Sequence, residues 1–289
     1  MRYEGAIYRP PSEAYSLLIQ VSFGCSHNKC VFCNMFKNQK FRIRKLEEVF
    51  EDLETAREQY REVKRVFLID GDALFLKTEN LEKILLKIKE LFPECERVGL
   101  SATAQDVLRK GEDDLRRLKE LGLKIIYMGV ESGSDEILKD NNKGSTAEEM
   151  IQAGQLVRKA GIKLSVSLIS GLGGKEKWEM HAVGTARVIS AMNPDYIGLL
   201  TLIVDENTGM YEKIAKGEIT LLSPKEVMIE TRKFVENLEL TNCLFRGNHA
   251  SNYAPISATL NKDKDQLLKQ LDSFIEADHS FKSDNFRRL

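Results

Sequence analysis

The stretch Gly24-Cys-Ser-His-Asn-Lys-Cys-Val-Phe-Cys-Asn34 directly follows an apolar run over residues 17–23. It places Cys25, Cys30 and Cys33 in one short loop at the exit of a predicted strand. Three thiolates this close together can converge on one point, which suits a metal ion or an iron–sulfur cluster. A cubane cluster normally takes four protein thiolates, so a loop that offers three can leave one iron open to a small molecule.

The composition sets loose bounds on the class of protein. The chain has 289 residues and a formal net charge of -1, so it fits one large domain or two small ones and has no general attraction for nucleic acid or anionic membranes. No signal peptide and no apolar run of membrane-spanning length is evident. Five cysteines, three of them in one loop, are typical of ligands in a reducing compartment rather than of a secreted disulfide framework. We therefore expect a cytoplasmic protein that does not engage a membrane.

Short β-rich runs alternate with longer helical patterns along most of the chain. The spacing of Leu46, Val49 and Leu53 predicts the first helix, and Ser145-Thr-Ala-Glu148 and Ser223-Pro-Lys-Glu226 predict the capped starts of two later helices. Six units of strand then helix predict parallel strands with right-handed crossovers, in either an open doubly wound sheet or a barrel. The predicted strands are residues 17–23, 65–69, 98–101, 125–130, 164–170 and 196–204.

Polar or glycine-rich sequence follows each predicted strand. In a β/α barrel all six strand ends surround a single mouth, where barrel enzymes place their chemistry, whereas an open sheet needs such loops only at one switch point. The pattern therefore predicts an α/β fold, a partial barrel of six β/α units. Besides the cysteine loop, these ends are Asp70-Gly-Asp72, Ser101-Ala-Thr103, Glu131-Ser-Gly-Ser134, Ser170-Gly-Leu-Gly-Gly174 and Asp205-Glu-Asn207.

The barrel pattern stops after about residue 240. We expect a core barrel over residues 1–240 and a short C-terminal extension over residues 241–289 that closes the barrel and ends in a polar tail. Within the extension, residues 241–257 look irregular and residues 264–274 are predicted to form a last helix. His181 and His279 are expected on the surface.

The cysteine loop resembles the signature of the radical S-adenosylmethionine superfamily, which is Cys-x3-Cys-x2-Cys with an aromatic residue just before the last cysteine. Phe32 supplies the aromatic residue, and the spacing from Cys30 to Cys33 matches. The first gap departs from the signature, because four residues instead of three separate Cys25 from Cys30. An extra residue in a loop can be absorbed there, so the cluster assignment is kept.

Later segments are similar to one branch of that superfamily, which contains the elongator catalytic subunit, the methylthiotransferases and oxygen-independent coproporphyrinogen oxidase. Residues 127–138 resemble its fourth-strand region, and residues 169–174 resemble its glycine-containing fifth-strand end. Asp70-Gly-Asp72 stands, in degenerate form, where the family has Gly-Gly-Glu. The resemblance covers roughly residues 15–205.

The resemblance implies an enzyme that holds a 4Fe-4S cluster on Cys25, Cys30 and Cys33 and binds S-adenosylmethionine at the open iron. An electron from the reduced cluster then cleaves S-adenosylmethionine to methionine and a 5′-deoxyadenosyl radical, which abstracts a hydrogen from the substrate. It also implies a reducing partner such as flavodoxin or ferredoxin. The protein holds the reactive carbon against one hydrogen and excludes water and oxygen.

The resemblance implies roles for further residues around S-adenosylmethionine. Phe32 would pack on the adenine, to which Gly171 and Leu172 would offer backbone contacts. Arg158 resembles the arginine that pairs with the methionine carboxylate. The remaining residues are expected to bind the methionine ammonium group, namely Asp70, Gly71 and Asp72, or the ribose hydroxyls, namely Glu131 and Ser132 with Ser101 and Thr103 as rivals.

Each of these assignments has a plainer alternative. The three cysteines with His27 could form a structural zinc site, and Phe32 could belong to the core. Asp70 and Asp72 could simply favour a turn, and Glu131 could be a solvated carboxylate. Arg158 could form a surface ion pair on the outer face of its helix.

The substrate is expected after the sixth helix, where hydrogen-bonding side chains are dense. Arg246, Asn248, His249 and Tyr253 could line its pocket, with Arg246 best suited to a carboxylate or phosphate. No RNA-binding, acetyltransferase, cobalamin or second cluster domain is recognisable, which favours a small-molecule substrate over tRNA. The rivals are a tRNA- or cofactor-modifying radical enzyme that acts with a partner, and a non-catalytic carrier of the cluster, S-adenosylmethionine or haem.

Overall fold

The computed structural model describes residues 1–276 and 281–288, and these residues fall into two compact units. The first unit contains residues 1–28, 35–128 and 155–164, and the second contains the rest of the described chain. The cysteine loop thus begins in the first unit and continues into the second. Among the described residues, no helix is long and apolar enough to cross a membrane.

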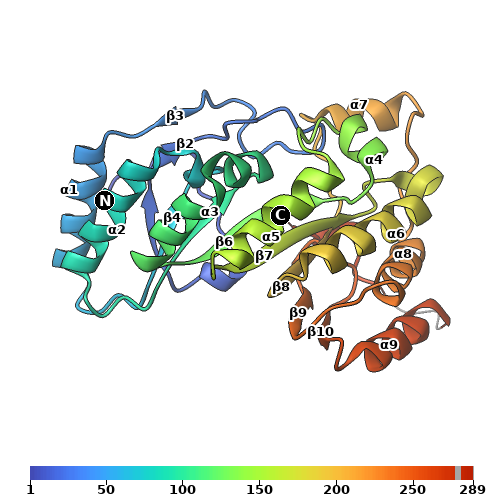
Figure 1. The fold of residues 1–289 in the computed structure, drawn as a ribbon. Helices are drawn as coiled ribbons and strands as arrows, with labels where there is room; N and C mark the ends of the chain where they lie inside the picture. The colour runs from blue at the N-terminus through green and yellow to red at the C-terminus, as the bar shows by residue number, and fades with distance from the viewer. Residues whose placement is uncertain (277–280, 289) are drawn as a thin grey trace. The chain divides into compact units, whose positions relative to one another are not determined.

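Parallel strands flanked by helices make up the first unit, in the order β1-β4-β5-β6 (Figure 1). The four residues of β4 after its first are all buried, as expected for a parallel strand covered on both faces. A separate antiparallel pair, β2 with β3, frames the cysteine loop. The strands are β1 (Leu17–Gln20), β2 (Ser22–Phe23), β3 (Arg42–Ile43), β4 (Arg65–Ile69), β5 (Arg97–Ala102) and β6 (Leu123–Glu131), and the helices are α1 (Leu46–Gln59), α2 (Thr78–Leu91) and α3 (Ala104–Glu120).

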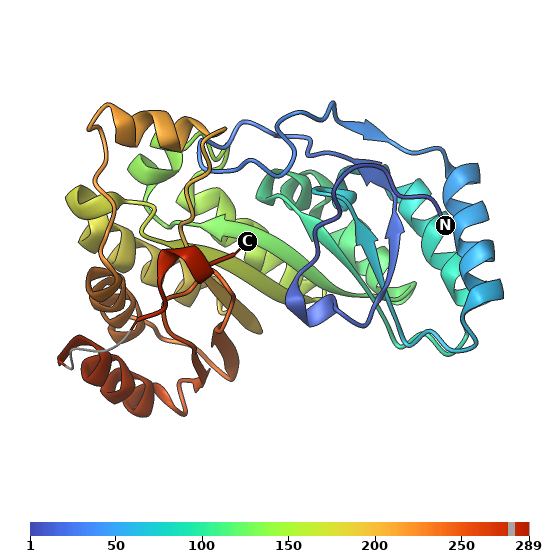
Figure 2. The ribbon, with the colours of Figure 1, turned by 180° about the vertical axis from the view of Figure 1, so that it is seen from behind.

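The second unit holds the strands β7, β8, β9 and β10 in that order, and only the last pair is antiparallel. Its last described segment, which includes the short 3-10 helix Asp284–Phe286, returns to the carboxyl end of β8 (Figure 2, red). The strands are β7 (Lys163–Ser170), β8 (Tyr196–Thr201), β9 (Cys243–Gly247) and β10 (Ile256–Leu260), and the helices are α4 (Asp135–Asp140), α5 (Ala147–Lys159), α6 (Gly174–Met192), α7 (Gly209–Ala215), α8 (Pro224–Glu236) and α9 (Lys264–Glu276).

The predicted α/β fold with mostly parallel strands is confirmed. All six predicted strands are present, although the first is divided into β1 and β2. The sheet is not closed, because within the described ranges β1 pairs only with β4 and β10 pairs only with β9. An open parallel sheet of this kind agrees with a partial barrel. The division at residue 240 into core and extension remains a prediction.

Three local predictions were wrong. Residues 241–257 are not wholly irregular, because β9 lies there and extends the parallel sheet beside β8. The cap of α5 uses Thr146 and Glu149, whose side chains each bind the other's backbone N–H, one residue later than the sequence indicated. His181 is 3% exposed rather than on the surface, since it faces inward from α6. His279 lies outside the described residues.

Candidate functional site

The first cysteine lies against the turn that follows β4. A Cβ atom at Gly71 would come within 2.8 Å of the Phe36 ring, 3.1 Å of the Cys25 Cβ and 3.2 Å of the Gly24 carbonyl oxygen. Carbon atoms in contact normally stay about 3.5–4.0 Å apart, so only glycine allows this approach. The strand end Asp70-Gly-Asp72 and the first cysteine are therefore packed together within the first unit.

Asp70 ties the same strand end to the start of the cysteine loop. Its carboxylate accepts hydrogen bonds from the Gln20 side chain at 2.8 Å and from the Gly24 N–H. Burial raises the pKa of Asp70 to about 6, although both hydrogen bonds oppose this shift. The other oxygen, Oδ1, is buried and has no hydrogen-bond partner. A buried carboxylate oxygen without a partner is costly unless a donor supplies a hydrogen bond.

Asp72 is fully buried and connects the cysteine loop to α3. The hydroxyl of Ser26 donates to its carboxylate. The pKa of Asp72 is raised, first by burial and then by the adjacent carboxyl group of Asp106. Asp106 in turn bonds Thr103 and Arg109. Ser26, Asp72, Asp106 and Thr103 therefore form a polar chain from the cysteine loop to the end of β5. Like Asp70 Oδ1, Asp72 Oδ1 is buried and has no hydrogen-bond partner.

Of the two rivals for the ribose, Thr103 is already engaged. Its hydroxyl caps α3 by accepting from the Asp106 N–H at 3.2 Å. Ser101 lies in β5 and is half-buried.

In the second unit the end of the cysteine loop is fastened by its backbone. The Val31 N–H donates to the Asn141 carbonyl after α4 at 3.0 Å, and the Val31 carbonyl accepts from the Met210 N–H in α7 at 3.1 Å. The Cys33 N–H donates to the Cys30 carbonyl at 3.3 Å, so the two cysteines flank a tight turn. Backbone contacts therefore hold the turn that carries both cysteines.

Phe32 and Leu172 belong to the same apolar cluster. Phe32 packs on the cluster from its edge, and Leu172 is 1% exposed in its centre. The structure thus brings together two of the three residues expected beside the adenine. It also agrees with the plainer view of Phe32 as part of the core. The other buried members of the cluster are Ile137, Leu202 and Met210.

Glu131 and Ser132, at the end of β6, have partners inside the protein. Glu131 is 8% exposed, lies 3.5 Å from the Lys143 ammonium group and accepts from the Ser167 hydroxyl at 3.3 Å. Burial raises its pKa. Its φ of 64° is unusual for a residue other than glycine and is often seen at functional sites. Ser132 shares a hydrogen bond with His181 Nδ1 at 2.9 Å. The solvated alternative for Glu131 was therefore wrong.

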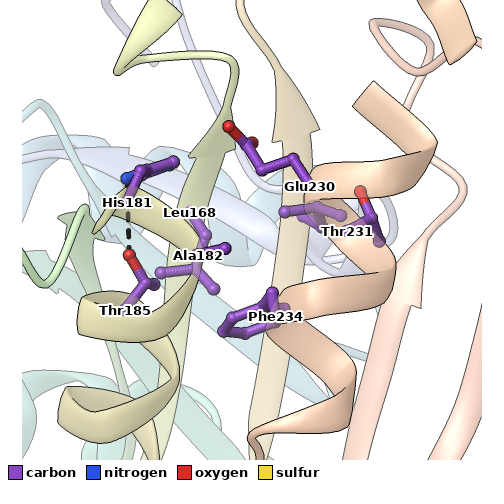
Figure 3. A pocket seen from close by; sticks show the side chains of 8 residues that line it. Leu168, His181, Ala182, Thr185, Glu230, Thr231 and Phe234 are labelled. Carbon is purple, nitrogen blue, oxygen red and sulfur yellow. Dashed lines mark hydrogen bonds between the residues drawn. The ribbon is translucent and has the colours of Figure 1, made fainter. Parts of the chain in front are cut away.

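The turn after β7 is held by a carboxylate that sequence reasoning missed. Glu230 of α8 accepts from the Ser170 hydroxyl at 2.6 Å and from the Gly171 N–H at 2.8 Å, and burial raises its pKa. Its second oxygen has no partner, and Glu230 lines a cavity of about 20 Å³ together with His181 and Thr185 of α6 (Figure 3). A cavity of this size holds one water molecule. The sequence signal that could have identified Glu230 is its position, because this charged residue shares an apolar helix face with Val227 and Phe234.

Arg158 and two of the four residues expected at the substrate are exposed. Arg158 is exposed in the last turn of α5, just before β7 begins, so its position gives no support to a role at the strand ends. Arg246 and Asn248 are exposed, on and after β9. His249 is half-buried, and its Nδ1 accepts from the Ser251 N–H at 3.1 Å.

Tyr253 lines a cavity together with Arg287. It is 8% exposed, and its hydroxyl donates to Asp284 at 2.9 Å. The same hydroxyl accepts from Arg287 at 2.7 Å.

The cysteines themselves carry no assembled metal site. All five lie among the described residues and none forms a disulfide. Over residues 1–276 and 281–288, no three Cys, His, Asp or Glu side chains form a group that could hold a metal ion. The ligand set of Cys25, Cys30 and Cys33 therefore remains a prediction from the sequence.

Comparison with known proteins identifies the family. The family model described as the radical SAM superfamily matches residues 19–184, more than half of the chain. An uncharacterized protein of Methanocaldococcus jannaschii is 26% identical over 239 residues, 78% of this chain and 72% of that protein. An uncharacterized methyltransferase of Pyrococcus horikoshii is 29% identical, over 62% of this chain and 38% of its own.

A haem chaperone of Bacillus subtilis is 24% identical, over 76% of this chain and 58% of its own length. This chain therefore spans less than two thirds of the chaperone and of the methyltransferase.

Solved structures share the fold. Methylornithine synthase aligns with a TM-score of 0.56 at 16% identity, over 94% of this chain and 75% of its own. Coproporphyrinogen III oxidase of Escherichia coli aligns with a TM-score of 0.55 at 19% identity, over 76% of this chain and 52% of its own. At such identities the likeness concerns the fold alone.

Proposed function

The chain belongs to the radical S-adenosylmethionine superfamily, and on that premise we propose that it is an enzyme whose Cys25, Cys30 and Cys33 hold the cluster. The family uses a 4Fe-4S cluster and S-adenosylmethionine. When bound, the two together supply a 5′-deoxyadenosyl radical that abstracts hydrogen. We propose a small molecule as the hydrogen donor, with a reducing partner such as flavodoxin or ferredoxin, in the cytoplasm.

The strongest support for the proposal is that the strand end packed against the first cysteine also holds an incompletely satisfied carboxylate. Gly71 lets the strand end approach Cys25, and the neighbouring Asp70 keeps a buried oxygen without a partner. An ammonium group carries three N–H donors and would satisfy that oxygen with a charge-assisted hydrogen bond. Asp70 is therefore our candidate for the methionine ammonium group. Asp72 is the second candidate, although Ser26 already occupies one of its oxygens.

The second unit supplies the remaining proposed contacts. Phe32 and Leu172 would give the adenine an apolar surface, and the Gly171 turn is held in place by Glu230. Glu131 and Ser132 stay the candidates for the ribose, although Glu131 is paired with Lys143 and Ser132 with His181. Holding the cofactor in a single orientation and keeping water away are what the protein itself contributes to the reaction.

A non-catalytic carrier is the alternative, and the haem chaperone among the relatives favours it. The two functions differ in whether S-adenosylmethionine is turned over. Anaerobically reconstituted, reduced protein should form 5′-deoxyadenosine slowly even without substrate. Cys30→Ala should abolish this product, whereas Cys95→Ala, a matched change outside the loop, should retain it.

A protein that keeps its cluster and binds S-adenosylmethionine without ever cleaving it would make the carrier function correct. A radical enzyme that modifies tRNA with a partner would also form 5′-deoxyadenosine, but formation would rise on addition of tRNA and partner rather than of a small molecule.

A further inference from the structure

A cavity of the second unit lies at the carboxyl ends of β7 and β8. Its volume is about 490 Å³, and its other walls are the start of α8 and the C-terminal segment that includes Arg287. Small-molecule pockets commonly measure about 300–1,000 Å³, and in β/α barrels they lie at this end of the strands. The cavity therefore has the size and the place of a ligand pocket.

Arg287, the buried cation in its wall, has no hydrogen bond left to offer. A guanidinium group has five N–H donors, and all five of Arg287 are used. They bond the carbonyl oxygens of Ser251, Leu202 and Thr201, the Tyr253 hydroxyl and the Asp284 carboxylate. The Arg287 side chain is 7% exposed, so it acts as a clamp between the C-terminal segment and the end of β8 rather than as an anion receptor.

The other polar groups of the wall are also engaged. The Lys175 ammonium group pairs with Glu226 at 2.8 Å. The hydroxyls of Ser170 and Thr201 donate to Glu230 and Asn252. An anionic ligand would share the Lys175 ammonium group with Glu226, and it would also meet the negative charge of Asp284, whose side chain is 73% exposed at the cavity.

Apolar side chains supply most of the cavity wall. Leu202, Ile203, Val204, Leu222 and Val227 all line it. Burial of apolar ligand surface contributes roughly 25 cal/mol per Å², whereas burial of an unpaired charge is strongly unfavourable.

We propose that this cavity is the substrate compartment and that it takes a neutral, mainly apolar small molecule. The assignment as substrate compartment rests on the proposed function, whereas the chemical class of the occupant rests on the cavity alone. It differs from the sequence expectation of an anion held by Arg246.

Two matched probes test the class. N-phenyl-1-naphthylamine is neutral and apolar, and 8-anilino-1-naphthalenesulfonate is its sulfonated counterpart. Equilibrium dialysis against the anaerobically reconstituted full-length protein should give about one neutral probe per chain, bound at least about tenfold more tightly than the sulfonate. Tighter binding of the sulfonate, or no binding of the neutral probe, would overturn the proposal.

Cavity-filling variants locate the probe. Ile203→Trp, at a half-buried loop position, and Leu222→Trp, at a buried one, should each weaken binding of the neutral probe at least about tenfold. Leu86→Trp, at a position of α2 that is 51% exposed, is the matched control and should bind the probe as the wild type does. Melting temperature and iron content identify a variant that fails to fold. Unchanged binding in a folded Ile203→Trp protein would place the probe elsewhere and overturn the assignment.

The proposed function is tested separately by 5′-deoxyadenosine formation in the wild type. If the wild type forms this product but does not bind the neutral probe, only the cavity proposal fails. If it binds the probe but forms none, the cavity stands as a ligand pocket and the enzymatic function fails.

Discussion

Gly71→Ala should loosen the cysteine loop. The new methyl group would lie 2.8 Å from the Phe36 ring and 3.1 Å from the Cys25 Cβ, so both must retreat by several tenths of an ångström. Phe36 is 5% exposed and packs edge-on against Tyr8 with the ring centres 5.5 Å apart, which leaves the ring little room. Overpacking of this kind costs about 1–3 kcal/mol. That is about 5- to 150-fold in the equilibrium between the ordered and the opened loop.

The assay is iron retention. Reconstituted wild-type and Gly71→Ala proteins are exposed to an iron chelator under anaerobic conditions, and the variant should lose iron faster by a factor in that range. Gly198→Ala is the matched control, because its added methyl group would meet only the Val166 carbonyl oxygen at 3.8 Å. Equal iron loss and an equal melting temperature for wild type and Gly71→Ala would refute the packing of the strand end on Cys25.

Three further predictions concern single side chains. Asp70→Asn should weaken binding of S-adenosylmethionine about 10- to 100-fold at unchanged iron content, because one charge-assisted hydrogen bond is lost. Asp113→Asn, at an exposed position, should leave the dissociation constant unchanged. Equal dissociation constants for wild type and Asp70→Asn would exclude Asp70 as the ligand of the methionine ammonium group. Burial raises the pKa of Glu230 above 4.5, so between pH 4.5 and the raised value the native state holds a proton that the unfolded chain has lost. Stability therefore falls as the pH rises through this range. The melting temperature of Glu230→Gln should lack this pH dependence, and parallel pH profiles for the variant and the wild type would contradict the prediction. Arg287→Ala should cost about 1.5–3 kcal/mol and speed hydrogen exchange at residues 250–253, and unchanged exchange there would show that the clamp is not formed.

The fold followed from the sequence because its signals are local. Alternating apolar runs and helical periods predict parallel strands with helices between them, and the capped start at Ser223 and Glu226 is present as predicted. β9 was missed because its five residues, Cys243–Gly247, are bounded by polar sequence and are fixed as a strand by pairing with β8. Pairing between distant segments leaves no periodic signal of its own.

The site was predictable only in part, for a similar reason. Asp70, Gly71 and Asp72 could be selected because they follow a strand, but their contacts with Cys25 and Ser26 depend on folding. Glu230 and Arg287 were missed because each acts on a strand end far away in sequence, through hydrogen bonds to Gly171 and Leu202. Tertiary hydrogen bonds of this kind are visible only once the chain is folded.

We propose that three cysteines hold a cluster with one iron left open for S-adenosylmethionine. Electron paramagnetic resonance of the reduced protein, combined with metal analysis, tests it most directly. We expect about four irons per chain, as one cubane requires, and a paramagnetic signal that changes when S-adenosylmethionine is added. A colourless protein with about one tightly bound zinc per chain and no such signal would show that the three cysteines do not hold such a cluster.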